Sequence, residues 1–245
     1  MLRALPRTFS LFRQMSSSAS ATSSALGQFS TCELSDALIK IGLPHGGHIP
    51  DVRRQSVYEG SADQRVCGPA YTVKMVLSSE KDAPKLTEHY VDTAERESVI
   101  VIDAPPLTKN AVWGGLMTAG AQARGALGVV ISGRCRDVAE HVAARFPIFA
   151  RGTSTLGQYP FTRPSAVQVP LKIDAEPAGC DFPSITINPG DFIVADEDGV
   201  VCVPANSVAV VIQLAEQGRE ADARCLEDIK VGLGVQASFK KHRGK

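Results

Sequence analysis

The segment from residue 98 to residue 137 constrains the fold more than any other part of the chain. It begins with a continuous apolar run at residues 98–104 (SVIVIDA) and contains a second one at residues 127–132. Between them lies a stretch of helical composition that opens near Gly115 and closes at Gly125. Two buried strands joined by a helix form a right-handed parallel crossover. The sequence therefore predicts an α/β domain with a parallel sheet.

Polar groups collect where this crossover reaches the carboxyl edge of the predicted sheet. There the start of the helix lies beside the carboxyl ends of both strands, and ligands of α/β sheets bind at such edges. Unpaired N–H groups at a helix start attract carboxylates. The candidate site residues are Gly114, Gly115, Leu116, Met117, Arg136, Asp137 and Glu140. By spacing alone, a surface ion pair beside a plain glycine turn explains these residues equally well.

Composition agrees with a soluble enzyme of one domain, or of one domain plus extensions. The 245 residues are 44% apolar, which is enough for a sizeable core, and 26 basic residues balance 26 acidic ones. This balance does not favour nucleic acid as a partner, and no apolar run is long enough to predict a membrane span. The six cysteines are scattered without a CxxC pair, so neither zinc nor a disulfide framework is expected. Cys135, between the two arginines of the segment, is interpreted as a plain strand-end residue.

The first thirty residues differ from the rest. Residues 1–32 contain no Asp or Glu, and Arg3, Arg7 and Arg13 alternate with apolar residues before a Ser/Ala/Thr-rich run at 16–24. This pattern is typical of a mitochondrial transit peptide. We therefore expect residues 1–28 to be a disordered leader to the mitochondrial matrix, and residues 29–245 to form the catalytic domain. The alternative is a disordered tail without function.

Other elements follow from local signals. Ser30 and Glu33 form a capping box that opens a helix ending near residues 41–42. Residues 86–97 are expected to be helical, and Asp198-Gly199 is a hairpin turn signal between short strands. A long helix is predicted at 205–231, followed by a solvated basic tail.

The spacing from Gly115 to Arg136-Asp137 and Glu140, G-x20-R-D-x2-E, resembles the signature of the RraA-like family. This family contains 4-hydroxy-4-methyl-2-oxoglutarate aldolases, related oxaloacetate decarboxylases, and bacterial RraA, an inhibitor of a ribonuclease. Four further blocks fit in family order: 31–38 (TCELSDAL), 67–72 (CGPAYT), 146–152 (FPIFARG) and 189–204 (PGDFIVADEDGVVCVP). The resemblance covers roughly residue 30 to the C-terminus. It implies a swivelling β/β/α-type sandwich that assembles as a homotrimer or hexamer with active sites at subunit interfaces.

The resemblance also implies a chemistry: a metal-dependent carbon–carbon lyase that releases pyruvate from short 2-oxo dicarboxylic acids. Asp137 would bind Mg²⁺ or Mn²⁺ directly, and Glu140 would bind it through a water molecule. Arg136 would contact the enolate oxygen or the carboxylate of the 2-oxo acid. The amides of Leu116 and Met117 would receive the C1 carboxylate.

One departure from the family pattern concerns Gly115, where the aldolases proper carry an Asp that orients water for proton transfer. Retro-aldol cleavage needs a base, whereas loss of CO₂ from oxaloacetate needs only an electron sink. We therefore expect oxaloacetate decarboxylation to dominate over aldol cleavage. Other acids are candidates for the base, in this subunit or a neighbouring one: Asp36, Asp103, Asp196, Glu197 and Asp198. The cluster at 196–198 is more simply interpreted as a polar hairpin.

Two other functions are compatible with parts of the pattern. A non-catalytic, RraA-like binding or regulatory protein is the main alternative, because RraA also carries the glycine form of the motif. A Rossmann-type methyltransferase is disfavoured, because the strand at 99–103 is followed by Ala-Pro-Pro and not by a glycine-rich loop.

Overall fold

The computed structural model describes residues 19–60, 64–175 and 180–244. A helix occupies residues 19–26. The helices that follow are α2 (Thr31–Lys40), α3 (Gly115–Arg124), α4 (Val138–Ala143), α5 (Val208–Lys230) and α6 (Val235–His242). The strands are β1 (Arg53–Arg54), β2 (Val66–Leu77), β3 (Val99–Asp103), β4 (Ala111–Trp113), β5 (Gly128–Cys135), β6 (Ile148–Thr153), β7 (Thr162–Val167), β8 (Leu171–Ile173), β9 (Ile185–Ile187), β10 (Phe192–Ala195) and β11 (Val200–Val203).

The predicted parallel crossover is confirmed. Strands β3 and β5 are parallel neighbours, with Asp103 paired to Ser132, and α3 connects them. The main sheet runs β1-β6-β5-β3-β2-β10-β11, with β4 on β5 and β7 on β2, while β8 and β9 form a separate hairpin. The short strand β4, which the sequence did not reveal, lies between β3 and α3 in the chain.

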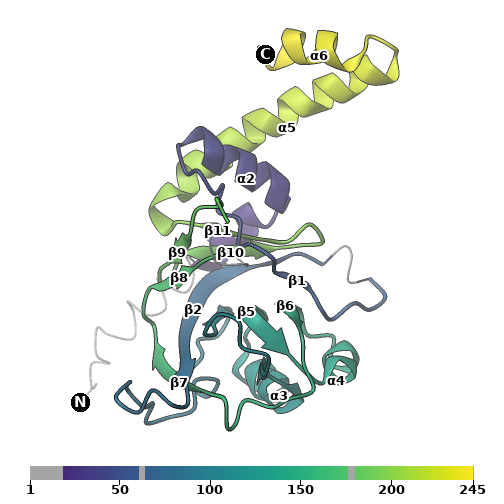
Figure 1. Cartoon of the computed structure of the whole chain (residues 1–245). Helices are drawn as coiled ribbons and strands as arrows, with labels where there is room; N and C mark the ends of the chain where they lie inside the picture. The colour runs from purple at the N-terminus through teal and green to yellow at the C-terminus, as the bar shows by residue number, and fades with distance from the viewer. Residues whose placement is uncertain (1–18, 61–63, 176–179, 245) are drawn as a thin grey trace, which may run out of the picture.

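Strand β2 bends the sheet into a nearly closed curl, as Figure 1 shows. Its first residues pair with β10, and the rest pair with β3 on one side and β7 on the other. The strand continues without interruption through Gly68 and Pro69. Pro69 is tolerated although it has no amide proton to donate to a neighbouring strand.

Three apolar clusters fill the layers. The first lies between the sheet and α3, the second between the sheet and the β8–β9 hairpin, and the third between β10–β11 and helices α2 and α5. In Figure 1, α3 and α4 lie at the end of the molecule opposite α2 and α5. These layers agree with the β/β/α sandwich expected from the sequence.

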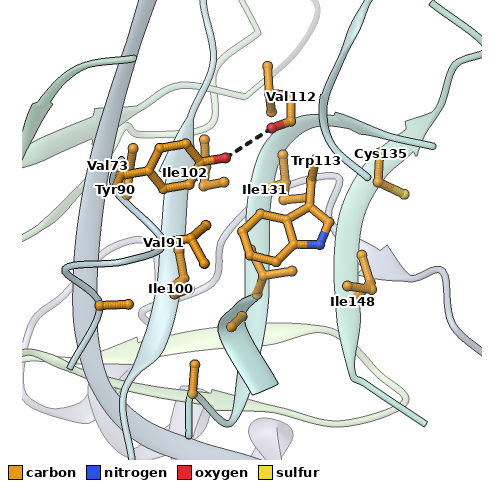
Figure 2. Packing of buried hydrophobic residues seen from close by; sticks show 14 of the residues in the cluster. Val73, Tyr90, Val91, Ile100, Ile102, Val112, Trp113, Ile131, Cys135 and Ile148 are labelled. Carbon is orange, nitrogen blue, oxygen red and sulfur yellow. Dashed lines mark hydrogen bonds between the residues drawn. The ribbon is translucent and has the colours of Figure 1, made fainter. Parts of the chain in front are cut away.

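Trp113 is one of the largest fully buried side chains and belongs to the first cluster. Its ring stacks on Phe146, with 6.4 Å between ring centroids. The hydroxyl of Tyr90, in the same cluster, donates to the carbonyl oxygen of Val112 at 3.3 Å (Figure 2). The core therefore fixes β4, the strand that leads directly into α3.

Several local expectations are confirmed. Helix α2 begins with the predicted capping box, in which the Ser30 side chain accepts from the Glu33 amide and Glu33 accepts from the Ser30 amide. Residues 195–200 turn between β10 and β11 as a hairpin. The long C-terminal helix is α5, which follows one 3₁₀ turn at Ala205–Ser207.

Three expectations were wrong. Residues 86–97 form turns and no helix, because Tyr90, Val91 and Ala94 are drawn into the first cluster. The basic tail forms α6, which packs on α5 through pairs such as Arg243 with Asp222. Residues 19–26, expected to be disordered, are helical because Leu26 is completely buried in the third cluster. The rest of the predicted leader, residues 1–18, lies outside the described residues.

None of the helices in the described ranges is long and apolar enough to cross a membrane.

Candidate active site

The pairing of β4 with β5 brings the two halves of the motif together. Trp113 is in register with Cys135, and the amide of Arg136 donates to the carbonyl oxygen of Trp113 at 2.9 Å. Each strand then runs into the start of a helix, with Gly114 before α3 and Asp137 before α4. Two helix N-termini therefore meet at the carboxyl edge of the sheet.

Asp137 turns its carboxylate toward α3. Its backbone is left-handed, with φ 61° and ψ 40°, a conformation that Asp tolerates better than most residues. Its Oδ2 accepts from the Gly115 amide at 3.0 Å and lies 3.5 Å from Nε of Arg136. A Cβ on Gly114 would come within 2.6 Å of the same oxygen, which explains the glycine. Asp137 therefore supplies the anion that the start of α3 attracts.

Glu140 also lies against Gly115. A Cβ added to Gly115 would overlap Glu140 Oε2 and come within 2.6 Å of Glu140 Cδ. The Glu140 carboxylate thus occupies the space where a side chain at residue 115 would start. Among the described residues, it makes no hydrogen bond or ion pair, so its oxygens are available to a ligand.

The amides at the start of α3 are not all available for a substrate. Gly115 donates to Asp137, and Met117 donates to the carbonyl oxygen of Gly114 at 3.0 Å. The expectation that the Met117 amide receives a carboxylate is therefore corrected, because the first turn of the helix closes on it. Within the described part of the chain, the Leu116 amide has no protein acceptor, and its side chain is 83% exposed.

Arg136 points its guanidinium toward the loop after β6. A Cβ on Gly157 would lie 2.9 Å from Nη1 of Arg136, so this loop passes close to the charged group. The side chains of Arg136 and Asp137 are 45% and 34% exposed. The pair is therefore open to solvent and to a small ligand.

The donor set fits a hard cation such as Mg²⁺ or Mn²⁺ better than a metal ion that is held by three or more protein side chains. The described ranges contain no group of three or more His, Cys, Asp or Glu side chains placed to hold a metal ion. Mg²⁺ is commonly bound through one or two carboxylates and keeps several waters. Asp137 and Glu140, which both lie against Gly115, provide such a pair.

Two of the other acids considered from the sequence have structural partners. Asp103 ends β3 on the side of the second cluster, where it pairs with Lys74; burial raises its pKa, and Lys74 opposes that shift. Asp196 is buried and accepts from the Thr31 amide at 2.8 Å, which holds the start of α2.

The remaining acids lie around α2. Asp198 accepts from Cys32, on α2, at 3.5 Å. Glu197 follows Asp196 in the turn between β10 and β11, which agrees with the interpretation of residues 196–198 as a polar hairpin. Asp36 is on α2. Within one described subunit, the structure does not bring these acids into contact with Asp137.

The sequence did not reveal the buried support of the site. His141 is fully buried on α4, and its Nδ1 lies 3.0 Å from Oγ1 of Thr118 on α3. Thr118 Oγ1 also accepts from Nε1 of Trp113 at 2.9 Å. Burial lowers the pKa of His141, opposed by the carbonyl of Arg136 and by Asp137 and Glu140. The one available signal was the position of His141, four residues after Asp137.

Cys135 is a core residue, as interpreted from the sequence. It is completely buried in the first cluster, and burial raises its pKa to about 11 (Figure 2). A thiol with this pKa is protonated at neutral pH and is not a nucleophile.

Comparison with known proteins identifies the family. The family model described as RraA-like, Aldolase/RraA, matches residues 31–202, which is more than half of the chain. Protein DlpA of Legionella pneumophila is 31% identical over 183 residues, covering 74% of this chain but only 27% of DlpA. The match thus spans about a quarter of that relative.

A second relative matches over most of its length. The Halalkalibacterium halodurans protein named "Putative 4-hydroxy-4-methyl-2-oxoglutarate aldolase" is 33% identical over 169 residues, which cover 68% of this chain and 74% of that protein. Among solved structures, an uncharacterised protein from Pseudomonas syringae pv. tomato superposes with a TM-score of 0.72 at 31% identity. It covers 90% of this chain and 97% of its own. The chain belongs to the RraA-like (aldolase/RraA) family.

Proposed function

We propose that the protein is a metal-dependent carbon–carbon lyase that releases pyruvate from short 2-oxo dicarboxylic acids, with oxaloacetate as its main substrate. The observation that carries the proposal is the meeting of Arg136, Asp137 and Glu140 at the start of α3. One cation and two carboxylates lie there beside the Gly114-Gly115 pair, which directly precedes the available Leu116 amide. The family and the aldolase name of a relative support the lyase class.

The residues of the site act on two parts of oxaloacetate, its C1 carboxylate and its C2 oxygen. The Leu116 amide and the start of α3 receive the C1 carboxylate, because a helix N-terminus favours an anion. When the C3–C4 bond of oxaloacetate breaks, CO₂ leaves and its electron pair moves toward the C2 oxygen. The guanidinium of Arg136 stabilises the negative charge that develops there. Solvent then protonates C3 and yields pyruvate.

Asp137 and Glu140 would hold Mg²⁺ or Mn²⁺, Asp137 directly and Glu140 through water. The metal, when bound, withdraws electrons from the 2-oxo group and so supplies the electron sink. Asp137 keeps one carboxylate oxygen on the Gly115 amide, and this bond orients the other oxygen as a ligand.

Cleavage of 4-hydroxy-4-methyl-2-oxoglutarate is a second candidate activity. It needs a base that removes the proton of the C4 hydroxyl. The residue expected in that role in the aldolases is Asp, and here the position is Gly115. The Glu140 carboxylate fills the space beside Gly115, which favours a weak aldolase activity alongside decarboxylation.

The decisive experiment measures pyruvate release from oxaloacetate by the purified protein with Mg²⁺, with Mn²⁺ and with EDTA. The control contains the metal alone, because free metal also decarboxylates oxaloacetate. We expect release well above the metal-only rate and its loss in EDTA. Release no faster than the control, for oxaloacetate and for 4-hydroxy-4-methyl-2-oxoglutarate, would favour the non-catalytic RraA-like alternative.

We further propose that the protein works as a homotrimer or hexamer with its sites at subunit interfaces. Large apolar side chains are exposed in one subunit at the start of α3 and in the loops before β4 and after β6: Leu116, Leu107, Leu156, Tyr159 and Phe161. Exposed apolar groups of this kind are typical of association surfaces. Light scattering after size exclusion should give three or six times the mass of one chain, and a monomer would refute the assembly.

We propose a mitochondrial matrix location, on the acid-free, arginine-rich start of the sequence. A fluorescent reporter fused to residues 1–30 should enter the matrix and lose part of the leader. The control replaces Arg3, Arg7 and Arg13 by Gln, because import depends on the positive charge. A cytosolic reporter would overturn the location.

A further inference from the structure

The buried residue of helix α4 is a histidine. Helix α4 has only six residues, which is too short to be stable by itself, and His141 is its buried side chain. An apolar side chain would fill the same space without the cost of burying a polar ring. Nε2 of His141 has no hydrogen-bond partner among the described residues. Burying an imidazole ring here therefore costs free energy that an apolar side chain would not, and the hydrogen bond of Nδ1 needs an explanation.

That contact belongs to a chain of side-chain hydrogen bonds across three elements. Nε1 of Trp113, on β4, donates to Oγ1 of Thr118, on α3. The same oxygen lies 3.0 Å from Nδ1 of His141, on α4. Trp is only a donor, so the Thr118 hydroxyl accepts from it and retains a proton and a second lone pair, one of which completes the bond to Nδ1 of His141 according to the tautomer of the ring.

Each member of the chain is bonded through its backbone to the site. The carbonyl oxygen of Trp113 accepts from the Arg136 amide, and the Thr118 amide donates to the Gly114 carbonyl at 3.2 Å. The His141 amide donates to the Asp137 carbonyl at 3.3 Å. The three buried side chains therefore tie together the two turns that carry the candidate site.

The turn at Asp137 needs such a support. Its left-handed backbone is sparsely populated by residues other than glycine and persists where the surroundings hold it. Asp137 is the N-cap of α4, yet its side chain makes no capping bond, because its carboxylate is bonded to Gly115 of α3. The start of α4 is thus held from its second turn, where His141 lies.

We propose that His141 is a positioning residue that, through Thr118, holds the Asp137 carboxylate against the Gly115 amide. Its effect on turnover rests on the proposed function, whereas its effect on the Asp137–Gly115 hydrogen bond does not. This hydrogen bond is therefore measured separately from activity.

The test uses two variants that cut the chain and two controls. His141→Phe keeps a ring of similar size and removes the hydrogen bond, and Thr118→Val is close to isosteric. His141→Asn restores a polar group near the place of Nδ1. Thr72→Val is the matched control, because Thr72 is also a buried threonine whose hydroxyl donates to a distant carbonyl, that of Val169 at 2.7 Å.

The first readout is the Gly115 amide proton in protein labelled with ¹⁵N-glycine, assigned by its loss in Gly115→Ala. A bond to a carboxylate shifts this proton downfield, so His141→Phe and Thr118→Val should move it upfield. His141→Asn should restore it in part, and Thr72→Val should leave it in place while lowering the melting temperature.

The second readout is Mn²⁺ affinity together with kcat and KM for pyruvate release. Loss of a group that orients a metal ligand typically costs 10–100-fold in metal affinity or activity. We expect His141→Phe to weaken Mn²⁺ binding and to lower kcat more than it raises KM.

The outcomes separate the two proposals. A folded His141→Phe or Thr118→Val variant with an unmoved Gly115 signal would refute the role of His141. If His141→Phe does not fold, Thr118→Val decides by the same signal. A wild type without lyase activity would refute the proposed function alone, because the Gly115 signal still reports on His141.

Discussion

At the scale of single residues, Asp137 has two roles, one structural and one in the proposed chemistry. Its carboxylate completes the start of α3 through the Gly115 amide, and it is also the proposed metal ligand. Both roles use the same carboxylate, but only the bond to Gly115 contributes to the fold. Substitutions that keep the shape and remove the charge should therefore separate them.

Asp137→Asn should lower metal-dependent pyruvate release by a hundredfold or more. Its amide oxygen can still accept from Gly115, so the melting temperature should stay close to that of the wild type. Arg136→Lys should also lose most of the activity, because an ammonium cannot reproduce the planar guanidinium; a lost contact of this kind costs about 3 kcal/mol. Steady-state kinetics with Asp222→Asn as a surface control test this, and wild-type turnover by Asp137→Asn would remove Asp137 from the mechanism.

Gly115→Asp should shift the ratio of specificity constants from oxaloacetate toward 4-hydroxy-4-methyl-2-oxoglutarate. The new carboxylate supplies the base, but its Cβ has to displace the Glu140 side chain. Gly115→Ala is the matched control: it displaces Glu140 without adding a base, so it should lower both activities. Equal specificity constants for the two substrates in the wild type would show that another group already acts as the base.

At the scale of elements, α2 joins parts of the chain that are distant in sequence. Its capping residue Glu33 binds Arg219 of α5, with Nε and Oε1 2.6 Å apart. The same guanidinium lies over the Phe29 ring and donates to the Gln28 carbonyl oxygen. One ion pair thus fastens the N-terminal segment, α2 and α5 together.

This pair predicts a pH dependence of stability. The hydrogen bond from Arg219, with those from Ser30, lowers the pKa of Glu33 from 4.5 to about 2 against the opposing effect of burial. A lowered pKa means that the stabilisation is complete above pH 4.5 and is lost as the pH falls toward 2. Glu33→Gln should therefore cost up to about 1 kcal/mol at neutral pH, since the pair is partly exposed.

Urea unfolding of wild type and Glu33→Gln from pH 7 downward measures this difference. The two free energies of unfolding should converge as the pH drops below 4.5, and added salt should reduce the gap at pH 7. A gap that stays constant down to the lowest pH at which both variants fold would assign the effect to packing.

At the scale of the whole molecule, the domain begins earlier than its family match. Leu26 and Phe29 fill the third cluster with α2, α5, β10 and β11, although the match starts at residue 31. Figure 1 shows α5 extending from this end of the molecule, with α6 beside its outer part. The helix at residues 19–26 is therefore part of the folded body.

Two truncations test where the domain begins. Removal of residues 1–18 should leave pyruvate release and the melting temperature unchanged. Removal of residues 1–28 also deletes Leu26, whose burial contributes about 2 kcal/mol or more, so the melting temperature should fall by several degrees. Equal melting temperatures for the two truncations would show that the helix adds nothing to stability.

The sequence alone determined the elements whose signals are local. The crossover from β3 through α3 to β5 follows from two apolar runs and glycines at both ends of the helix. The capping box of α2 and the β10–β11 hairpin depend on residues within a few positions of each other. The grouping of Gly115, Arg136, Asp137 and Glu140 also followed, because a parallel crossover fixes which ends of its elements share an edge.

The tertiary structure decided what depends on contacts between distant residues. The short strand β4 forms because it pairs with β5 and because Trp113 packs in the core. The segment at 86–97 forms turns in place of a helix because Tyr90 is buried in the same core. Burial of Leu26 orders residues 19–26, although their composition is typical of a leader. Which amide of α3 is available, and where the ring of His141 lies, follow from side-chain geometry that spacing in the sequence does not encode.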